Sequence, residues 1–540
     1  MAILITIFNQ IPILLGSCSI ETVGRGLQTA ATSLFPINIE RMNQVISTIS
    51  SYGSRLTGYP GYYDTLDYLC NYLSNDIGIQ VKQQKYTLVI PYEEETYIEV
   101  LEPYSMRINA YALYPNGINP SPTPPEGITG KLVYVGEGNV DDLNGKDIPG
   151  NIIAMDFNSR DNWLKVASLG AEAVIFIEPD GETNFLECND KFLDTPICFP
   201  RVYVKKSDWE IMKSANKVRL VTRISWREIT AANIIGYING TDGSGDVVIL
   251  STHFDSWSVV PRLASSKTEL IPVALLLEYA RFLANNPPKY NVWIVFYSGH
   301  WQALAGPREF VEEFFFRRED VARGSLTPIL NINFDLIASD SDGLQILYTG
   351  MFSTYGGYDI HQNAPNRIQW FSTEIANMLS NDANIKSFAM SVFKTNASNL
   401  LSSYLTYQSY WGTEPVFYML DSEPVFYSGL SAFTITSRRS ARYYLGSPIE
   451  DSRYANLTVL DPYLQIALRV VDNLLRMNWE GFNRESSRPT RLNLVAALGF
   501  PGYALFQGQV KTYNFSKGWH DPVPNVLVEV SIGTSTYKLN

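Results

Sequence analysis

The chain has 540 residues, of which 45% are apolar and 18% charged, and its formal net charge is −12. A chain of this length can bury more than one core, so we expect two or three domains. The charge is acidic and no face of clustered Lys and Arg stands out, which excludes nucleic acid as a partner and an anionic membrane surface as the main binding target.

The first 34 residues are predicted to form a mostly apolar segment of their own. Asn9 and Gln10 interrupt the apolar run and no basic region precedes it, which argues against a standard signal peptide. The residues from Leu15 to Cys18 resemble a lipid-attachment box. Two interpretations stay open: a signal or anchor, and a segment that packs on the body or on a partner. No later stretch is apolar enough to span a membrane, so anchoring would come from this segment or from a missing C-terminal part.

Residues 35–90 are predicted to begin the largest domain. Apolar residues recur at helical spacing over 38–50 and 64–73 and alternate along 78–90, which predicts two helices and a strand. Residues 91–225 then contain a Pro-rich breaker at 119–127, followed by alternating strands and helices. This alternation predicts a small inserted α/β domain.

Residues 226–480 are predicted to complete the largest domain. The expected elements are strands at 233–240, 246–255, 290–299 and 328–338 and helices at 271–286, 306–315 and 460–478. Buried strands separated by amphipathic helices are typical of an α/β fold, with a mostly parallel sheet covered on both faces. Such sheets bind ligands at the carboxyl ends of their strands. The residues that follow these strands are His253, Asp255, His300, Trp301 and Asp335.

The last residues, 491–540, have strand character, as in the run LVEV and the alternating run QGQVKTY. They are predicted to be the start of a small β-domain of β-sandwich type. A fragment of two or three strands is marginal alone, so it either packs on the body or belongs to a domain that continues.

Cysteines and glycosylation motifs favour an oxidising compartment. Cys188 and Cys198 bracket a short polar loop and are predicted to form a disulfide. Four N-glycosylation motifs begin at Asn239, Asn396, Asn456 and Asn514. Together these features predict an exported protein that is extracellular or attached to the cell surface.

The order of several segments resembles the co-catalytic zinc aminopeptidase and glutamate carboxypeptidase family with an inserted protease-associated domain. The segments that carry the resemblance are GSRLTGYPGYYDTLDYL at 53–69, GKLVYVGEG at 130–138, GAEAVIFIEPD at 170–180, and residues 233–256, 293–313, 331–340 and 421–433. The resemblance extends over residues 35–478 and implies the zinc-peptidase fold.

The resemblance implies two zinc ions held by His and carboxylate ligands, with a further glutamate as the base. His253 takes the position of the first ligand, and Asp255 the position of the carboxylate that orients it. Asp335 matches another ligand.

Other family positions are altered in this chain. Lys267 stands where the bridging aspartate is expected, and its ammonium could occupy the vacated site. His300 and Trp301 replace the two adjacent glutamates, and Leu445 lies where the last histidine is expected. The resemblance therefore implies a degenerate site, with no metal, no other cofactor and no catalytic residue.

Since most of these ligands are missing, we expect a non-catalytic protein that acts as a structural, assembly or binding component. The transferrin receptor and nicalin are family members of this kind, so protein partners or self-assembly are expected. One alternative is a zinc-dependent aminopeptidase or amidohydrolase with an atypical metal site rebuilt from His253, His300 and Asp335. The other is a peptide or small-ligand receptor that uses the old cleft.

Overall fold

The computed structural model describes residues 33–538, apart from 116–119, 193–196, 336, 349, 351–359, 404–418, 439–443, 450, 485–486, 488–508, 525–528 and 533–534. The apolar segment expected at residues 1–34 thus lies outside the described residues, except for its last two. Within the described part, no helix is both long and apolar enough to cross a membrane.

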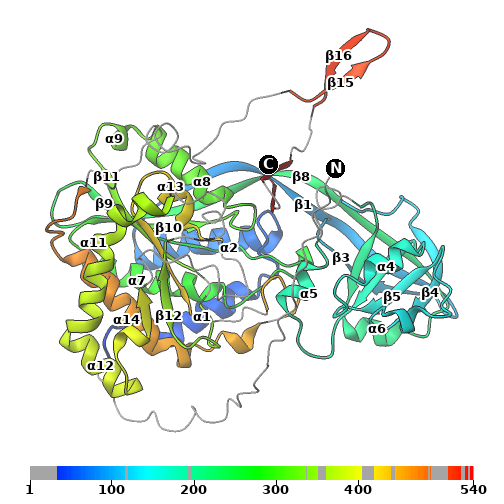
Figure 1. Ribbon diagram of the computed structural model, residues 1–540, viewed down its shortest axis with the longest axis horizontal. Coiled ribbons are helices and arrows are strands. Elements are labelled where there is room, and N and C mark those ends of the chain that lie inside the picture. Colours follow the sequence, from blue (N-terminus) through cyan, green and yellow to red (C-terminus); the bar gives the residue numbers. More distant parts are fainter. Residues whose placement is uncertain are drawn as a thin grey trace, which may run out of the picture.

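A mostly parallel sheet forms the centre of the larger lobe, as predicted (Figure 1). Its parallel strands are β14 (Ala432–Ser437), β11 (Thr327–Phe334), β9 (Asp246–His253) and β10 (Asn291–Tyr297), in that order. The short strands β12 (Leu344–Leu347) and β13 (Leu401–Ser403) extend one side. The residues of β9 are all buried, which explains their nearly continuous apolar sequence.

Helices cover this sheet and enclose the largest hydrophobic core of the molecule. They include α1 (Ile39–Ser50), α2 (Pro60–Asn71), α7 (Leu270–Asn285), α8 (Ala305–Val311), α11 (Ile360–Asn381), α12 (Ala383–Phe393), α13 (Ser422–Tyr427) and α14 (Leu457–Arg476). Helix α1 starts where the sequence predicts, because the Asn38 side chain accepts a hydrogen bond from the Arg41 amide.

The inserted lobe continues the same sheet. Its strands are β2 (Met106–Asn109), β3 (Tyr111–Ala112), β4 (Ile128–Tyr134), β5 (Ile152–Asp156), β6 (Ala173–Ile177) and β7 (Arg201–Val204), and its helices include α4 (Trp163–Ser168), α5 (Phe185–Asn189) and α6 (Lys206–Met212). Two long antiparallel strands, β1 (Gln80–Glu102) and β8 (Lys217–Ile238), run from the larger lobe into the insert.

The boundaries predicted at 90/91 and 225/226 fall inside this ribbon, where Pro91 pairs with Trp226. Both strands continue through these positions, and the irregularity between Glu93 and Glu95 is a bulge in the ladder. The two lobes are therefore joined by paired strands and not by linkers.

The described strands of the C-terminal region form hairpins, and the β-sandwich stays a prediction. β15 (Lys511–Asn514) pairs with β16 (Trp519–Pro522), and β17 (Glu529–Ile532) pairs with β18 (Ser535–Lys538). The described tail thus consists of two hairpins in separate sheets.

The predicted disulfide is not formed, since Cys188 and Cys198 are both free thiols. Cys188 lies on α5 with its side chain in the core of the insert, whereas Cys198 is exposed, so the two face different environments. The glycosylation candidates Asn239, Asn396 and Asn456 are exposed and Asn514 is partly exposed. Glycosylation at the four positions stays a prediction.

Candidate metal centre

Two histidines meet at the carboxyl edge of the sheet. His253 ends β9 and His300 follows β10, and the parallel register pairs Tyr297 of β10 with His253. The two imidazole rings stack with centroids 3.9 Å apart and planes inclined by 20°. Both side chains are buried, with 1% of each exposed. The expectation that these strand ends converge is therefore confirmed.

Asp421, just before α13, holds both rings. Its Oδ2 lies 3.1 Å from Nδ1 of His253, and its Oδ1 lies 2.9 Å from Nδ1 of His300. Burial favours the neutral carboxylic acid, but the two imidazoles outweigh it and keep the pKa of Asp421 well below its usual range. Both Nδ1 atoms therefore lie beside one carboxylate, and an ion held by these three groups would take the place of the protons between them.

Proton affinity at the rings is set by the same carboxylate. Burial lowers the pKa of His300, but the charge and hydrogen bond of Asp421 outweigh it and raise the pKa to about 9. Burial and the His300 charge also lower the pKa of His253, yet the hydrogen bond to Asp421 and the charges of Asp421 and Asp335 raise it overall. These surroundings therefore stabilise the protonated, positively charged form of both imidazoles.

Asp335, at the end of β11, completes the group. Its Oδ1 lies 3.7 Å from Nδ1 of His253. Both of its carboxylate oxygens, and Nε2 of His253, are buried without a hydrogen-bond partner among the described residues. Buried polar atoms are normally paired, so these orphaned atoms mark a place for a ligand.

Asp255 has a different partner from the one predicted. Its Oδ2 accepts hydrogen bonds from the Thr57 hydroxyl at 2.8 Å and from the His300 amide at 3.1 Å. The Thr57 hydroxyl in turn accepts from the Gly299 amide at 3.0 Å. Asp255 thus positions the loop that carries His300, and Asp421 takes the role of orienting His253.

Several buried ionisable groups surround these residues. The carboxyl groups are those of Asp255, Glu269, Asp335, Asp421 and Asp451, and the basic groups are those of Arg55, His253 and His300. Burial raises the pKa of Glu269 to about 8, against the charges of His253 and Arg55, so this carboxyl favours the neutral acid at pH 7. Burial raises the pKa of Asp255 as well.

The donor set fits a metal ion. His253, His300 and Asp421 can each offer one ligand atom, and the three atoms lie within 4.8 Å of one another. Imidazole and carboxylate are the ligands that zinc takes in catalytic sites. The expectation of a relic pocket with no metal is replaced by a group that can hold an ion. The sequence analysis named His253 and His300 but missed Asp421, which lies in the segment 421–433 and follows no strand.

The loop after His300 is strained. Ala303 and Leu304 both have positive φ, at 55° and 58°. A Cβ on Gly299, which has φ of 65°, would lie 2.8 Å from the Tyr86 hydroxyl, so a glycine is needed there. Strain of this kind collects at functional sites, where the surrounding structure enforces it.

An aromatic wall bounds one side of the group. Trp301 is partly buried and packs on Leu445, as does Phe185 of the insert. It stacks on Trp257, with ring centroids 5.9 Å apart, and its ring meets that of His300 edge to face. The positions predicted for a zinc ligand and for the last histidine therefore form an apolar wall.

Lys267 lies on a loop that Asp451 holds. Its amide donates to Asp451 at 2.7 Å, and the residue lines an opening between the lobes together with Lys205 and Glu178 of the insert. That its ammonium occupies the vacated metal position stays a prediction.

Comparisons with known proteins agree with this fold. The description "Peptidase family M28" matches residues 233–387. The structure is similar to BSAP, a zinc aminopeptidase from Bacillus subtilis, with a TM-score of 0.50 and 16% identity, over 84% of this chain and 98% of that one. The "Probable lipoprotein aminopeptidase LpqL" of Mycobacterium tuberculosis (strain ATCC 25618 / H37Rv) is 27% identical over 306 residues, which are 54% of this chain and 56% of that protein. The match thus spans about half the length of this relative.

These findings correct the expectation of a non-catalytic protein. The relatives are named as aminopeptidases, the family match is to a peptidase family, and the described residues include a buried His-His-Asp group. That expectation rested on how many of the family's zinc-ligand positions still carry a ligand residue. It gave too little weight to a metal site formed by residues at other positions.

Proposed function

We propose that this chain, which has the zinc aminopeptidase fold of Peptidase family M28, is a metal-dependent aminopeptidase with an atypical site. His253, His300 and Asp421 would hold the ion. The observation that carries the proposal is the buried His-His-Asp group with orphaned atoms on His253 and Asp335. The proposal is one of the alternatives given in the sequence analysis, an aminopeptidase with an atypical metal site, and it adds Asp421 to the candidate ligands.

The chain's own residues would contribute orientation and exclusion of water. In the absence of an ion, Asp421 holds both imidazoles by Nδ1 and so orients them beside its carboxylate. Asp255 fixes the amide of His300 through its Oδ2. Trp301 and Leu445 keep one side of the group dry. A bound zinc ion would supply Lewis-acid polarisation of the scissile carbonyl.

Two further features belong to the same proposal. We assign residues 91–225 as a protease-associated domain, because a parallel β4–β5–β6–β7 arrangement with short helices fills this part of the chain. The insert also reaches the wall beside the site, since its Phe185 packs on Leu445. An exported or surface-attached location is supported by the lipoprotein name of the mycobacterial relative.

The proposal is tested by hydrolysis of a panel of aminoacyl 4-nitroanilides by the purified, zinc-loaded protein. We expect turnover that a chelator removes and added zinc restores, and that His253→Ala abolishes. His520→Ala is the matched control, because His520 is an exposed residue of β16. Turnover that persists in His253→Ala, or no turnover of any substrate in the panel, would reject the proposal.

A further inference from the structure

We infer that Trp301 and Gln302, on the loop that follows His300, bind the peptide unit that comes after the scissile bond of the substrate. The indole N–H of Trp301 and the carboxamide of Gln302 are the groups that contact this unit. The inference rests on the proposed function for the presence of a scissile bond at the metal group. It adds two substrate-binding residues that are not candidate metal ligands.

The loop that carries His300 places Trp301 beside the metal group. The Trp301 ring meets the ring of His300 edge to face, with centroids 4.8 Å apart, and that of His253 with centroids 6.3 Å apart. Gln302 comes next, and its amide donates to the Gly299 carbonyl at 3.3 Å. The two residues after it have positive φ, so the loop is tightly turned at this point.

The polar atoms of these two side chains have no hydrogen-bond partner among the described residues. Nε1 of Trp301 is buried and unpaired, and so are both Oε1 and Nε2 of Gln302, whose residue is 8% exposed. Buried polar atoms are almost always paired, by protein, water or ligand. Three such atoms on adjacent residues therefore mark a place where a polar ligand completes the hydrogen bonds.

The chemistry of these atoms matches an uncharged peptide unit. An indole nitrogen only donates, so Trp301 needs an acceptor such as a carbonyl oxygen. A carboxamide offers a donor and an acceptor side by side, so Gln302 needs a ligand that has both a carbonyl and an N–H. A metal cation cannot bind to N–H groups, and a carboxylate or phosphate would leave Oε1 of Gln302 without a donor.

Other unpaired buried atoms beside the metal group are acceptors. They include carboxylate oxygens of Asp255 and Asp335. Such oxygens suit a cation, whereas the N–H donors of Trp301 and Gln302 suit a carbonyl oxygen. Since the scissile carbonyl is assigned to the ion, these N–H donors are left for the peptide unit that follows it.

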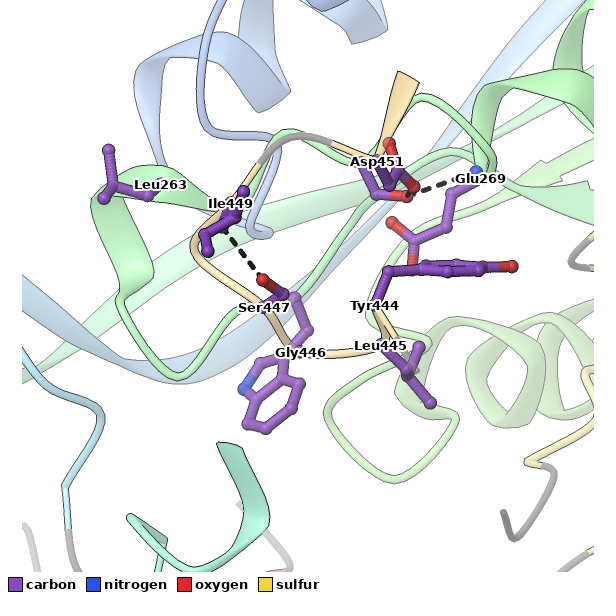
Figure 2. Close-up of a pocket in the computed structure, with 10 residues that line it drawn as sticks. Leu263, Glu269, Tyr444, Leu445, Gly446, Ser447, Ile449 and Asp451 are labelled. Atoms are coloured by element: carbon purple, nitrogen blue, oxygen red, sulfur yellow. Dashed lines mark hydrogen bonds between the residues drawn. The ribbon is translucent and has the colours of Figure 1, made fainter. Parts of the chain in front are cut away.

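The aromatic wall holds the indole in place. Trp301 stacks on Trp257, with ring centroids 5.9 Å apart, and packs on Leu445. Figure 2 shows the Leu445 side chain directed away from those of Leu263 and Ile449, which line the small pocket on the other side. A ring that is already fixed loses little side-chain entropy when its N–H binds a ligand.

The test is calorimetric binding of two phosphinic pseudopeptides to the zinc-loaded protein at pH 7. In both probes a phosphinate and a methylene replace the scissile amide between leucine and glycine, so neither can be hydrolysed. One probe ends in a glycine N-methylamide, which completes the next peptide unit, and the other ends in the methyl ester, which lacks the N–H. Because their metal contacts are the same, the ratio of the two affinities reports on the peptide unit alone.

We expect the wild type to bind the amide probe at least tenfold more tightly than the ester probe, because the ester leaves Oε1 of Gln302 without a donor. Gln302→Met keeps the length of the side chain, removes its donor and acceptor, and should bring the ratio to about one. Trp301→Phe removes the indole N–H and should weaken both probes about tenfold, with little effect on the ratio.

The matched control is Gln369→Met, at an exposed position of α11, which should bind both probes as the wild type does. Zinc content, measured in parallel, should stay at the wild-type level in all three variants, since none of the substituted residues is a candidate ligand.

Two results would overturn the inference. One is equal affinity of the wild type for the two probes, or no binding of either. The other is a ratio that Gln302→Met leaves unchanged, as expected if the carboxamide only holds a fixed water. Either result could occur with chelator-sensitive hydrolysis intact, in which case the proposed function survives and the assignment of Trp301 and Gln302 fails. Selectivity for the amide that depends on Gln302, in a protein without hydrolysis, would support the peptide site and reject the peptidase.

Discussion

The imidazole rings of His253 and His300 stack face to face, with centroids 3.9 Å apart. Two rings whose pKa values are both raised repel each other when protonated, so the stack needs an anion or a shared ligand to stabilise it. Asp421 supplies the anion through a hydrogen bond to each ring. A metal ion would take the place of the protons, because His binds metal as the neutral ring.

Asp421→Asn tests this arrangement. The amide keeps the shape of the side chain, but it has one accepting oxygen in place of two, so one imidazole loses its orienting partner. We expect zinc affinity to fall about 10- to 100-fold. Competition titration with a zinc-binding dye measures it, with Asp461→Asn as the control, since Asp461 accepts from Gln465 on α14. Unchanged zinc affinity in Asp421→Asn would contradict the role given to this residue.

The loop before α7 should depend on Asp451. Asp451 accepts from two hydroxyls and from the amides of Lys267 and Thr268. In Asp451→Asn one oxygen becomes a donor and faces groups that need an acceptor. We expect a loss of about 2 kcal/mol in the free energy of unfolding, measured by denaturant titration. A loss below about 0.5 kcal/mol would show that these hydrogen bonds do not hold the loop.

Glu93 should make the stability of the fold depend on pH. Its side chain is buried, with Arg262 at 3.4 Å, and burial raises its pKa to about 7 against the opposing charge of Arg262. The folded state then binds a proton more tightly than the unfolded state. The contribution of Glu93 to the free energy of unfolding is therefore fully present below about pH 4 and is lost as pH rises toward 7. Glutamine does not ionise, so Glu93→Gln should abolish this loss of stability at high pH. We expect it to raise the free energy of unfolding at pH 8 by about 2 kcal/mol.

The measurement for Glu93 is the denaturation midpoint from pH 4 to 8 in the wild type, Glu93→Gln and Glu94→Gln. Glu94 is the exposed neighbour on the same strand, and its variant should follow the wild-type profile. Parallel profiles of the wild type and Glu93→Gln over this range would show that Glu93 does not set the pH dependence.

Trp301→Ala separates packing from metal binding. Trp301 stacks on Trp257 and contacts Leu445, so truncation leaves a cavity beside the site. We expect about 2–3 kcal/mol lower stability, with zinc stoichiometry unchanged because tryptophan is not a ligand. Trp519→Ala is the control, since Trp519 on β16 is 71% exposed. Loss of zinc in a Trp301→Ala protein that remains folded would show that the wall helps to hold the ion.

Much of the fold was accessible from the sequence, and so were the positions of two candidate ligands. His253, His300 and Asp335 each follow a predicted buried strand, and parallel pairing brings the ends of such strands to one edge. Asp421 precedes a short helix and follows no strand, so the rule that located the others does not apply to it. The partner of Asp255 was also missed, since side-chain hydrogen bonds depend on rotamers that residue spacing does not determine.

The predicted disulfide is wrong, and the course of the chain between the two lobes was not predicted, for related reasons. The β1–β8 ribbon carries the alternating pattern through both lobes, so no change of composition marks a linker at Pro91 or Trp226. Cys188 and Cys198 are close in sequence, but closeness in sequence does not set the direction of a side chain, and Cys188 points into the core.

The most direct test of the account is the zinc stoichiometry of the purified protein, measured by equilibrium dialysis followed by elemental analysis. The account predicts one tightly bound zinc ion per chain in the wild type and His520→Ala, and a large loss of zinc in folded His253→Ala. A folded wild-type protein that binds no zinc at micromolar free metal, or a His253→Ala protein that retains the full complement, would contradict it.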